Sequence, residues 1–142
     1  MMISTKGRYA LRVMIDLAEQ GKTDYIPLKE IAARQDISQK YLESIMTVLS
    51  KNNLIEALHG KGGGYRLNRE VEEYKVGDIL RVTEGSLAPV SCLDCSSKPC
   101  ENSLGCKTLP MWKKLNNIIN DYLDSVTIAD LIQNEMTDNY VI

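Results

Sequence analysis

The chain contains no run of about eighteen apolar residues, the shortest stretch that is typical of a transmembrane helix. The amino terminus also lacks the unbroken apolar core of a signal peptide, because charge and helical periodicity begin within its first turns. There is no internal repeat and no low-complexity segment in the 142 residues, a length that suits one domain or one domain with an appended module. These absences predict a soluble, cytoplasmic protein without a membrane segment.

An excess of positive charge, which many nucleic-acid-binding proteins show, is missing as well, since the net charge is −2. The charges are nevertheless unevenly distributed. Residues 1–70 hold 11 basic and 8 acidic side chains, a net charge of +3, whereas residues 71–142 hold 6 and 11, a net charge of −5. The asymmetry places any contact with a polyanion in the first half of the chain.

The first half has the pattern of a winged helix-turn-helix. Helical periodicity predicts helices over 4–20, 27–35 and 38–51, with Ser4 and Ser38 as N-caps. The second and third helices are separated only by the short break QDIS, as in a helix-turn-helix. In LIEALHGKGGGYRLNRE, two short apolar runs flank a glycine-rich tip, which predicts a hairpin. The fold class is therefore mainly α with a small β-hairpin.

The glycine-rich tip does not have the features of a nucleotide-binding loop. A phosphate-binding loop needs a lysine followed by Ser or Thr at the start of a helix, and a dinucleotide site needs a strand–loop–helix unit. Here GKGGGY lies between two predicted strands. Its glycines instead fit a wing whose bare backbone can lie close to DNA.

The second half is predicted to contain a short helix over 76–84, a long helix that Thr108 caps, and a last helix to about residue 134 that begins with the capping box TIAD. The long helix carries an apolar stripe near heptad spacing. Its members are Leu109, Trp112, Leu115, Ile118, Ile119, Tyr122 and Leu123. The stripe either packs on its own domain or forms a dimer interface. The expected division is 1–75 for DNA binding, 76–107 for the cysteine-rich effector segment, and 108–142 for dimerisation, last helix and tail.

All four cysteines lie within fifteen residues, CLDCSSKPCENSLGC. Disulfides are uncommon in the cytoplasm, so such a cluster more often indicates metal or redox chemistry. Zinc usually takes two close-set pairs, and only Cys92 and Cys95 form one. Iron–sulfur clusters use thiolates at less regular spacings. A zinc site, a cluster, a thiol switch, a disulfide framework and chance gathering remain as alternatives.

Four segments together resemble the Rrf family of bacterial winged-helix transcription regulators. They are STKGRYAL, IAARQDISQKYLE, HGKGGGY and VGDILRVTEG, and the resemblance runs in order from Met1 to about Leu131. It implies a homodimeric repressor that binds partly palindromic double-stranded DNA. The family's reading helix corresponds to 38–51 here.

The resemblance also implies which residues contact DNA. The base-reading face of the third helix comprises Ser38, Gln39, Lys40, Glu43, Ser44 and Thr47. The backbone anchors are Ser4, Thr5, Lys6 and Arg8. The wing departs from the pattern, because His59 stands where iron–sulfur members have arginine. We expect His59 to contact DNA from the wing and Lys61 to supply the wing's charge.

Iron–sulfur members hold their cluster with three cysteines before the dimer helix, which correspond to Cys92, Cys100 and Cys106. Their usual fourth ligand, a histidine, is replaced by Leu109, so Cys95 or a carboxylate from elsewhere in the dimer would complete the set. The predicted cofactor is a [2Fe-2S] or [4Fe-4S] cluster, which an apo form would lack. No enzyme activity is expected, because Cys92-x2-Cys95 lacks the strand–helix–strand setting of a thiol oxidoreductase. The alternative is a cluster-free repressor of cysteine metabolism that binds cysteine synthase through Ile142.

Overall fold

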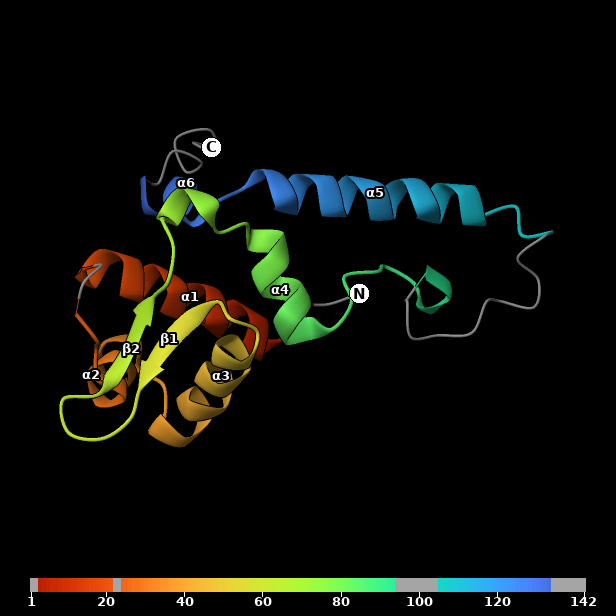
Figure 1. Ribbon diagram of the computed structural model, residues 1–142. Helices are drawn as coiled ribbons and strands as arrows, with labels where there is room; N and C mark the ends of the chain where they lie inside the picture. The colour runs from red at the N-terminus through yellow and green to blue at the C-terminus, as the bar shows by residue number, and fades with distance from the viewer. Residues whose placement is uncertain (1–2, 22–23, 94–104, 134–142) are drawn as a thin grey trace.

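The computed structural model describes residues 3–21, 24–93 and 105–133 (Figure 1). Three helices lead into a hairpin, and a fourth helix connects this unit to a long helix that extends away from it. The elements in chain order are α1 (Thr5–Gln20), α2 (Leu28–Gln35), α3 (Gln39–Lys51), β1 (Ile55–Leu58), β2 (Gly64–Leu67), the short turn η1 (Val71–Glu73), α4 (Val76–Glu84), the short turn η2 (Ser91–Leu93), α5 (Leu109–Ser125) and α6 (Ile128–Gln133). The predicted winged helix-turn-helix with a long C-terminal helix is confirmed.

Side-chain caps begin three of these helices where the sequence predicts them. The hydroxyl of Ser4 accepts from the amide of Gly7 at 3.2 Å, and that of Ser38 accepts from the amide of Tyr41 at 3.2 Å. Thr127 and Asp130 accept from each other's amides in a capping box. The prediction for Thr108 is wrong, since its backbone is already helical and its side chain caps nothing. Its hydroxyl instead contacts the thiol of Cys106.

The turn between α2 and α3 is fixed by its backbone. Asp36 adopts the left-handed conformation (φ 54°, ψ 50°), which aspartate tolerates better than most residues. The next amide, of Ile37, donates to the carbonyl of Ala32 at 3.1 Å, and the Ile37 side chain is buried. These contacts set the direction in which α3 leaves α2.

The wing is an antiparallel pair in which Ile55 faces Leu67 and Leu58 faces Gly64. Ile26 extends the pair on the far side of β2 through two backbone hydrogen bonds with Tyr65, of 2.8 and 2.9 Å. Gly64 permits this contact, because a Cβ at this position would collide with the carbonyl of Ile26. The base of the wing is thereby held to the segment before α2.

The main core lies among α1, α2, α3 and the hairpin, and also takes in Ile79 of α4 and Ile128 of α6. The predicted apolar stripes of α1 and α3 face it. One charged side chain is buried beside it: Asp16 of α1 accepts two hydrogen bonds from Arg34, of 3.0 and 2.8 Å, and a third from Gln35. This charge-paired contact holds α2 against α1.

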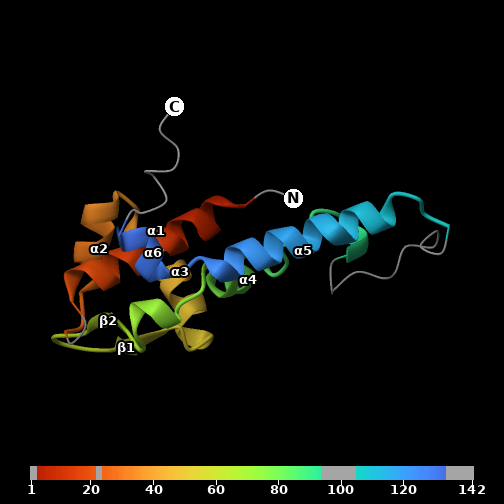
Figure 2. The same cartoon turned by 90° about the horizontal axis from the view of Figure 1, so that it is seen from above.

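A second apolar cluster lies where α4 meets α5. Its buried members are Val76, Leu80, Leu87 and Val126, and Ile119 and Leu123 of α5 pack against them. The rest of α5 extends well beyond the winged helix in both views (Figures 1 and 2). The stripe predicted for this helix therefore divides in two. One part faces α4, and another part, joined by Met111, is exposed.

Candidate DNA-binding surface and cysteine segment

All six residues predicted for the reading face are exposed, five of them on α3 and one, Ser38, as its N-cap. Their hydroxyl groups are partly engaged by the helix itself. Ser44 donates to the carbonyl of Tyr41 at 2.6 Å, and Thr47 donates to the carbonyl of Glu43 at 2.8 Å. These two side chains are consequently fixed in direction and offer acceptor lone pairs to a ligand. Gln39, Lys40 and Glu43 carry the larger polar groups of the face.

Two shallow hollows join α3 to its neighbours. One connects Thr5 of α1 to Ser38 at the start of α3, and is lined by Tyr9, Asp36, Ile37 and Tyr41 as well. The other connects Thr47 of α3 to His59 of the wing, with Tyr65 at its wall. Burial raises the pKa of Tyr65, and the nearby Glu43 carboxylate adds to the rise. The two hollows thus bring Thr5 beside Ser38 and Thr47 beside His59.

The start of α1 differs from its predicted role in one respect. Thr5 and Arg8 are exposed, and the Arg8 guanidinium donates to the Thr5 hydroxyl at 3.3 Å. Lys6 is half-exposed. Ser4, however, has its amide and its hydroxyl both bound to the carboxylate of Glu84, at 3.1 and 2.6 Å. Its hydroxyl proton is therefore already used within the chain.

Sequence reasoning treated Tyr9 and Tyr41 only as core residues. Their rings pack edge to face, with centroids 5.9 Å apart, and both line the hollow between α1 and α3. Arg12 lies over the Tyr9 ring at 5.0 Å and donates to the Gln35 carbonyl. Tyrosine has a polar hydroxyl on an apolar ring, and Tyr9 lies next to the basic residue Arg8 in the sequence. This was the sequence signal that could have placed the two tyrosines at the edge of the predicted DNA-binding surface.

Two of the four cysteines, Cys92 and Cys106, lie within the described residues, and both are free and half-exposed. The Thr108 side chain, 3.3 Å from the sulfur, lowers the pKa of the Cys106 thiol, and the Thr108 and Leu109 amides act in the same direction. The segment that connects Cys92 to Cys106 starts at η2, which packs against α5. Cys95, Cys100 and Ile142 lie outside the described residues.

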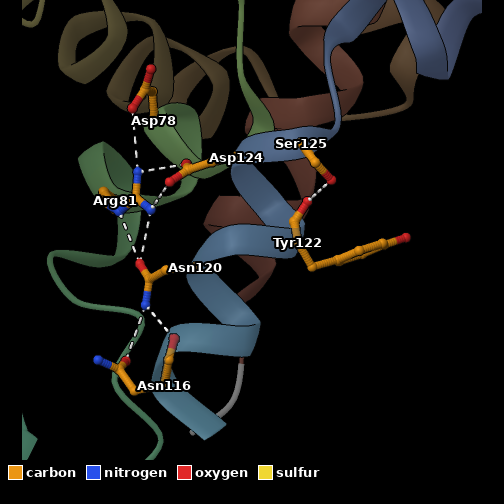
Figure 3. A network of polar contacts seen from close by, with 7 residues as sticks. All are labelled: Asp78, Arg81, Asn116, Asn120, Tyr122, Asp124 and Ser125. Carbon is orange, nitrogen blue, oxygen red and sulfur yellow. Dashed lines mark hydrogen bonds and ion pairs between the residues drawn. The ribbon is translucent and has the colours of Figure 1, made fainter. Parts of the chain in front are cut away.

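A polar network joins α4 to α5 beside this segment (Figure 3). The Arg81 guanidinium binds both carboxylate oxygens of Asp124 at 2.9 Å and the amide oxygen of Asn120 at 2.8 Å. This contact lowers the pKa of Asp124 and raises that of Arg81. Gly77 permits the approach, because a Cβ there would collide with Asp124. Sequence reasoning missed this network, since 43 positions separate Arg81 from Asp124.

Within residues 3–21, 24–93 and 105–133, no group of three or more potential metal ligands comes together. In the same ranges, no helix is both long and apolar enough to cross a membrane.

A helix-turn-helix with an exposed second helix and a hairpin wing defines a DNA-binding regulator. The chain belongs to the Rrf2 family: the family model, described as an iron-dependent transcriptional regulator, matches residues 3–134. The regulator IscR of Vibrio parahaemolyticus is 34% identical over 142 residues, which cover 100% of this chain and 81% of the relative.

Solved structures agree with this assignment. CymR, the global cysteine regulator of B. subtilis, superposes with a TM-score of 0.74 at 35% identity, covering 94% of this chain and 98% of CymR. IscR of T. potens superposes with a TM-score of 0.73 at 35% identity, covering 100% and 93%. The predicted family is confirmed, and its members found here are transcriptional regulators rather than enzymes.

Proposed function

We propose that this regulator is a homodimeric, sequence-specific repressor whose DNA affinity is set by an iron–sulfur cluster, or by the thiol state, of the segment that contains Cys92, Cys95, Cys100 and Cys106. One observation carries the proposal: the cysteine segment joins the DNA-binding half directly to a long helix of which the described residues bury no side chain fully. A change in the cluster or thiol state of that segment can therefore alter how the reading helix is placed relative to the dimer contact.

The proposed dimer is supported by the outer face of α5. None of the residues of this helix is fully buried by the described chain. Four large apolar side chains recur at intervals of four, three and four, the spacing of a coiled-coil seam. They are Met111, Leu115, Ile118 and Tyr122, with exposed fractions of 54, 37, 54 and 49%. A second copy of α5 would cover this seam and give the two-fold symmetry that suits a palindromic DNA site.

DNA recognition then uses the surface described above. α3 enters the major groove, where Gln39 reads base edges and Glu43 accepts a hydrogen bond from cytosine N4. Thr5, Lys6 and Arg8 bind phosphates beside it and fix the register of the protein. The wing, with His59 and Lys61, approaches the adjacent minor groove.

The two described thiols fit an iron–sulfur cluster. Cluster ligands are thiolates, and the pKa of Cys106 is lowered by Thr108. Cys92 lies free at the other end of the segment. A cluster would be bound by Cys92, Cys100 and Cys106, with Cys95 as fourth ligand. Oxidation or competing ligands would change or remove such a cluster, which suits a sensor. The description of the family model as iron-dependent supports this assignment.

The cluster itself is tested by anaerobic purification followed by an absorption spectrum and an iron and sulfide assay. We expect a coloured protein with stoichiometric iron and sulfide, and a Cys106→Ala variant that is folded but has lost the colour. Cys106→Ala is informative because the Thr108 hydroxyl contacts the Cys106 sulfur and stabilises its thiolate. A colourless, iron-free wild-type protein would contradict the cluster assignment and leave the thiol-state version.

A second function is favoured by the likeness to CymR. In this version the protein has no cluster, represses genes of cysteine metabolism, and binds cysteine synthase through its C-terminal Ile142. Deletion of Ile142 should then abolish co-purification with cysteine synthase while leaving DNA affinity unchanged. Retention of the enzyme by the truncated chain would exclude this tail-mediated contact.

A further inference from the structure

The DNA-contacting end of α1 is attached to the second half of the chain as well as to the winged-helix core. Ile3 packs against the second apolar cluster, whose buried members come from α4, from Leu87 and from Val126. Ser4, the next residue, is bound to Glu84 through its amide and its hydroxyl. Two different kinds of contact thus hold the same end of the helix, across 80 positions of sequence.

Glu84 sets the direction of the Ser4 hydroxyl. Because the hydroxyl proton points to the carboxylate, a lone pair is left for the amide of Gly7, which donates to it at 3.2 Å. The carboxylate also lies at the positive end of the α1 dipole, where a negative charge is stabilising. The carboxylate lies so close to α1 that a Cβ at Gly7 would collide with it. Glu84 therefore holds the N-cap of α1, and with it the direction of Thr5, Lys6 and Arg8.

Glu84 is also the last residue of α4, which is followed by the buried Leu87 and then by η2, where the cysteine segment starts. Gly85 follows with a φ of 81°, and its amide donates to the carbonyl of Arg81 at 2.9 Å. Arg81 holds α5 through Asp124 and Asn120. One helical turn therefore carries the contacts to α1 and to α5. The chain reaches Cys92 shortly after it.

We propose that Glu84 is a positioning residue for DNA binding: its bonds to Ser4 couple the cysteine segment to the DNA-contacting end of α1. A change in the segment moves the last turn of α4, and Glu84 carries that movement to the N-cap. Ser4 itself then positions the phosphate-binding side chains instead of contacting phosphate. The coupling between the cysteine segment and α1 rests on the proposed sensing function. The positioning of the start of α1 by Glu84 does not depend on it.

The test compares Glu84→Ala with Glu84→Gln, whose amide oxygen can still accept both bonds. Operator-type DNA selected from a random library is titrated with each protein, once with reduced cysteines and once after complete alkylation by iodoacetamide. We expect Glu84→Ala to lower the affinity of the reduced protein about five- to tenfold and to bring the ratio between the two cysteine states close to one. Glu84→Gln should retain most of the wild-type affinity and ratio. Glu73→Ala, which removes an exposed carboxylate from the neighbouring turn η1, is the matched control and should behave as wild type.

A purely stabilising role for Glu84 would reduce both affinities by the same factor and keep the ratio, which would overturn the coupling. If the wild-type ratio is itself close to one, the thiol-state version of the sensing function fails, and hydrogen exchange of the DNA-free protein decides the positioning role. Glu84→Ala should then speed exchange of the amides at the start of α1, Gly7 above all, relative to Glu84→Gln. Equal exchange in the two variants would overturn the positioning role.

Discussion

Replacing Ile118 by aspartate should convert the protein to a monomer and weaken its binding to a palindromic DNA site by about a hundredfold or more. Ile118 is 54% exposed in the isolated chain and lies in the middle of the apolar seam of α5. In a dimer, the substitution buries an unpaired carboxylate against the second copy of the helix, which is strongly unfavourable. DNA affinity falls with it, because a monomer engages one half-site only. Sedimentation velocity and a DNA titration measure the two effects.

Asn117→Asp is the matched control for this variant. It introduces the same carboxylate on the same helix, one position away and therefore on a different face, at a residue that is already exposed and polar. We expect it to remain dimeric and to keep most of its DNA affinity. A dimeric Ile118→Asp variant with unchanged DNA affinity would show that the seam of α5 does not form the interface.

Replacing Asp16 by alanine should lower the free energy of unfolding by about 2–3 kcal/mol. The Asp16 side chain is 2% exposed and accepts three hydrogen bonds, two from Arg34 and one from Gln35. Its loss leaves these donors without their acceptor at the junction of α1 and α2. The effect stays slightly below that of breaking a fully buried ion pair, about 3–5 kcal/mol, because the Arg34 side chain, 34% exposed, can turn to water. Urea unfolding at a fixed protein concentration measures it.

Arg34 also provides an internal control, because it has a second acidic partner. Glu30 lies 3.8 Å from it one helical turn away and is 60% exposed. Glu30→Ala should change the free energy of unfolding by less than about 0.5 kcal/mol, as surface pairs usually do. Equal effects of the two substitutions would contradict the view that burial of Asp16 makes this contact matter.

The winged helix could be predicted from the sequence because its signals are local. The serine caps lie next to the stripes that they begin, and the glycine-rich tip lies between the strands that it joins. The family resemblance added the predicted DNA contacts, and the structure places Thr5 beside Ser38 and Thr47 beside His59.

Other features depend on which elements meet, and local patterns do not contain that information. Ser4 was predicted as an anchor to the DNA backbone, and its hydrogen bond to Glu84, 80 positions away, could not be predicted from local patterns. Asp16 was not singled out from the sequence, because its partner Arg34 lies on a different helix, 18 positions away. The apolar stripe of α5 was predicted as one surface, but α4 covers only the part near Ile119 and Leu123. Thr108 has the residue type of a cap, yet its hydroxyl lies beside a thiol.

The most direct test of the proposed function is the affinity of the purified protein for its selected DNA before and after removal of the cluster, with the thiols kept reduced. If the cysteine segment sets DNA affinity, the two dissociation constants should differ by about tenfold or more, the size of an ordinary coupling between two sites. Cys106→Ala should show a single affinity, unaffected by the same treatment. Equal wild-type affinities in both states would contradict the proposal that the cysteine segment controls DNA binding.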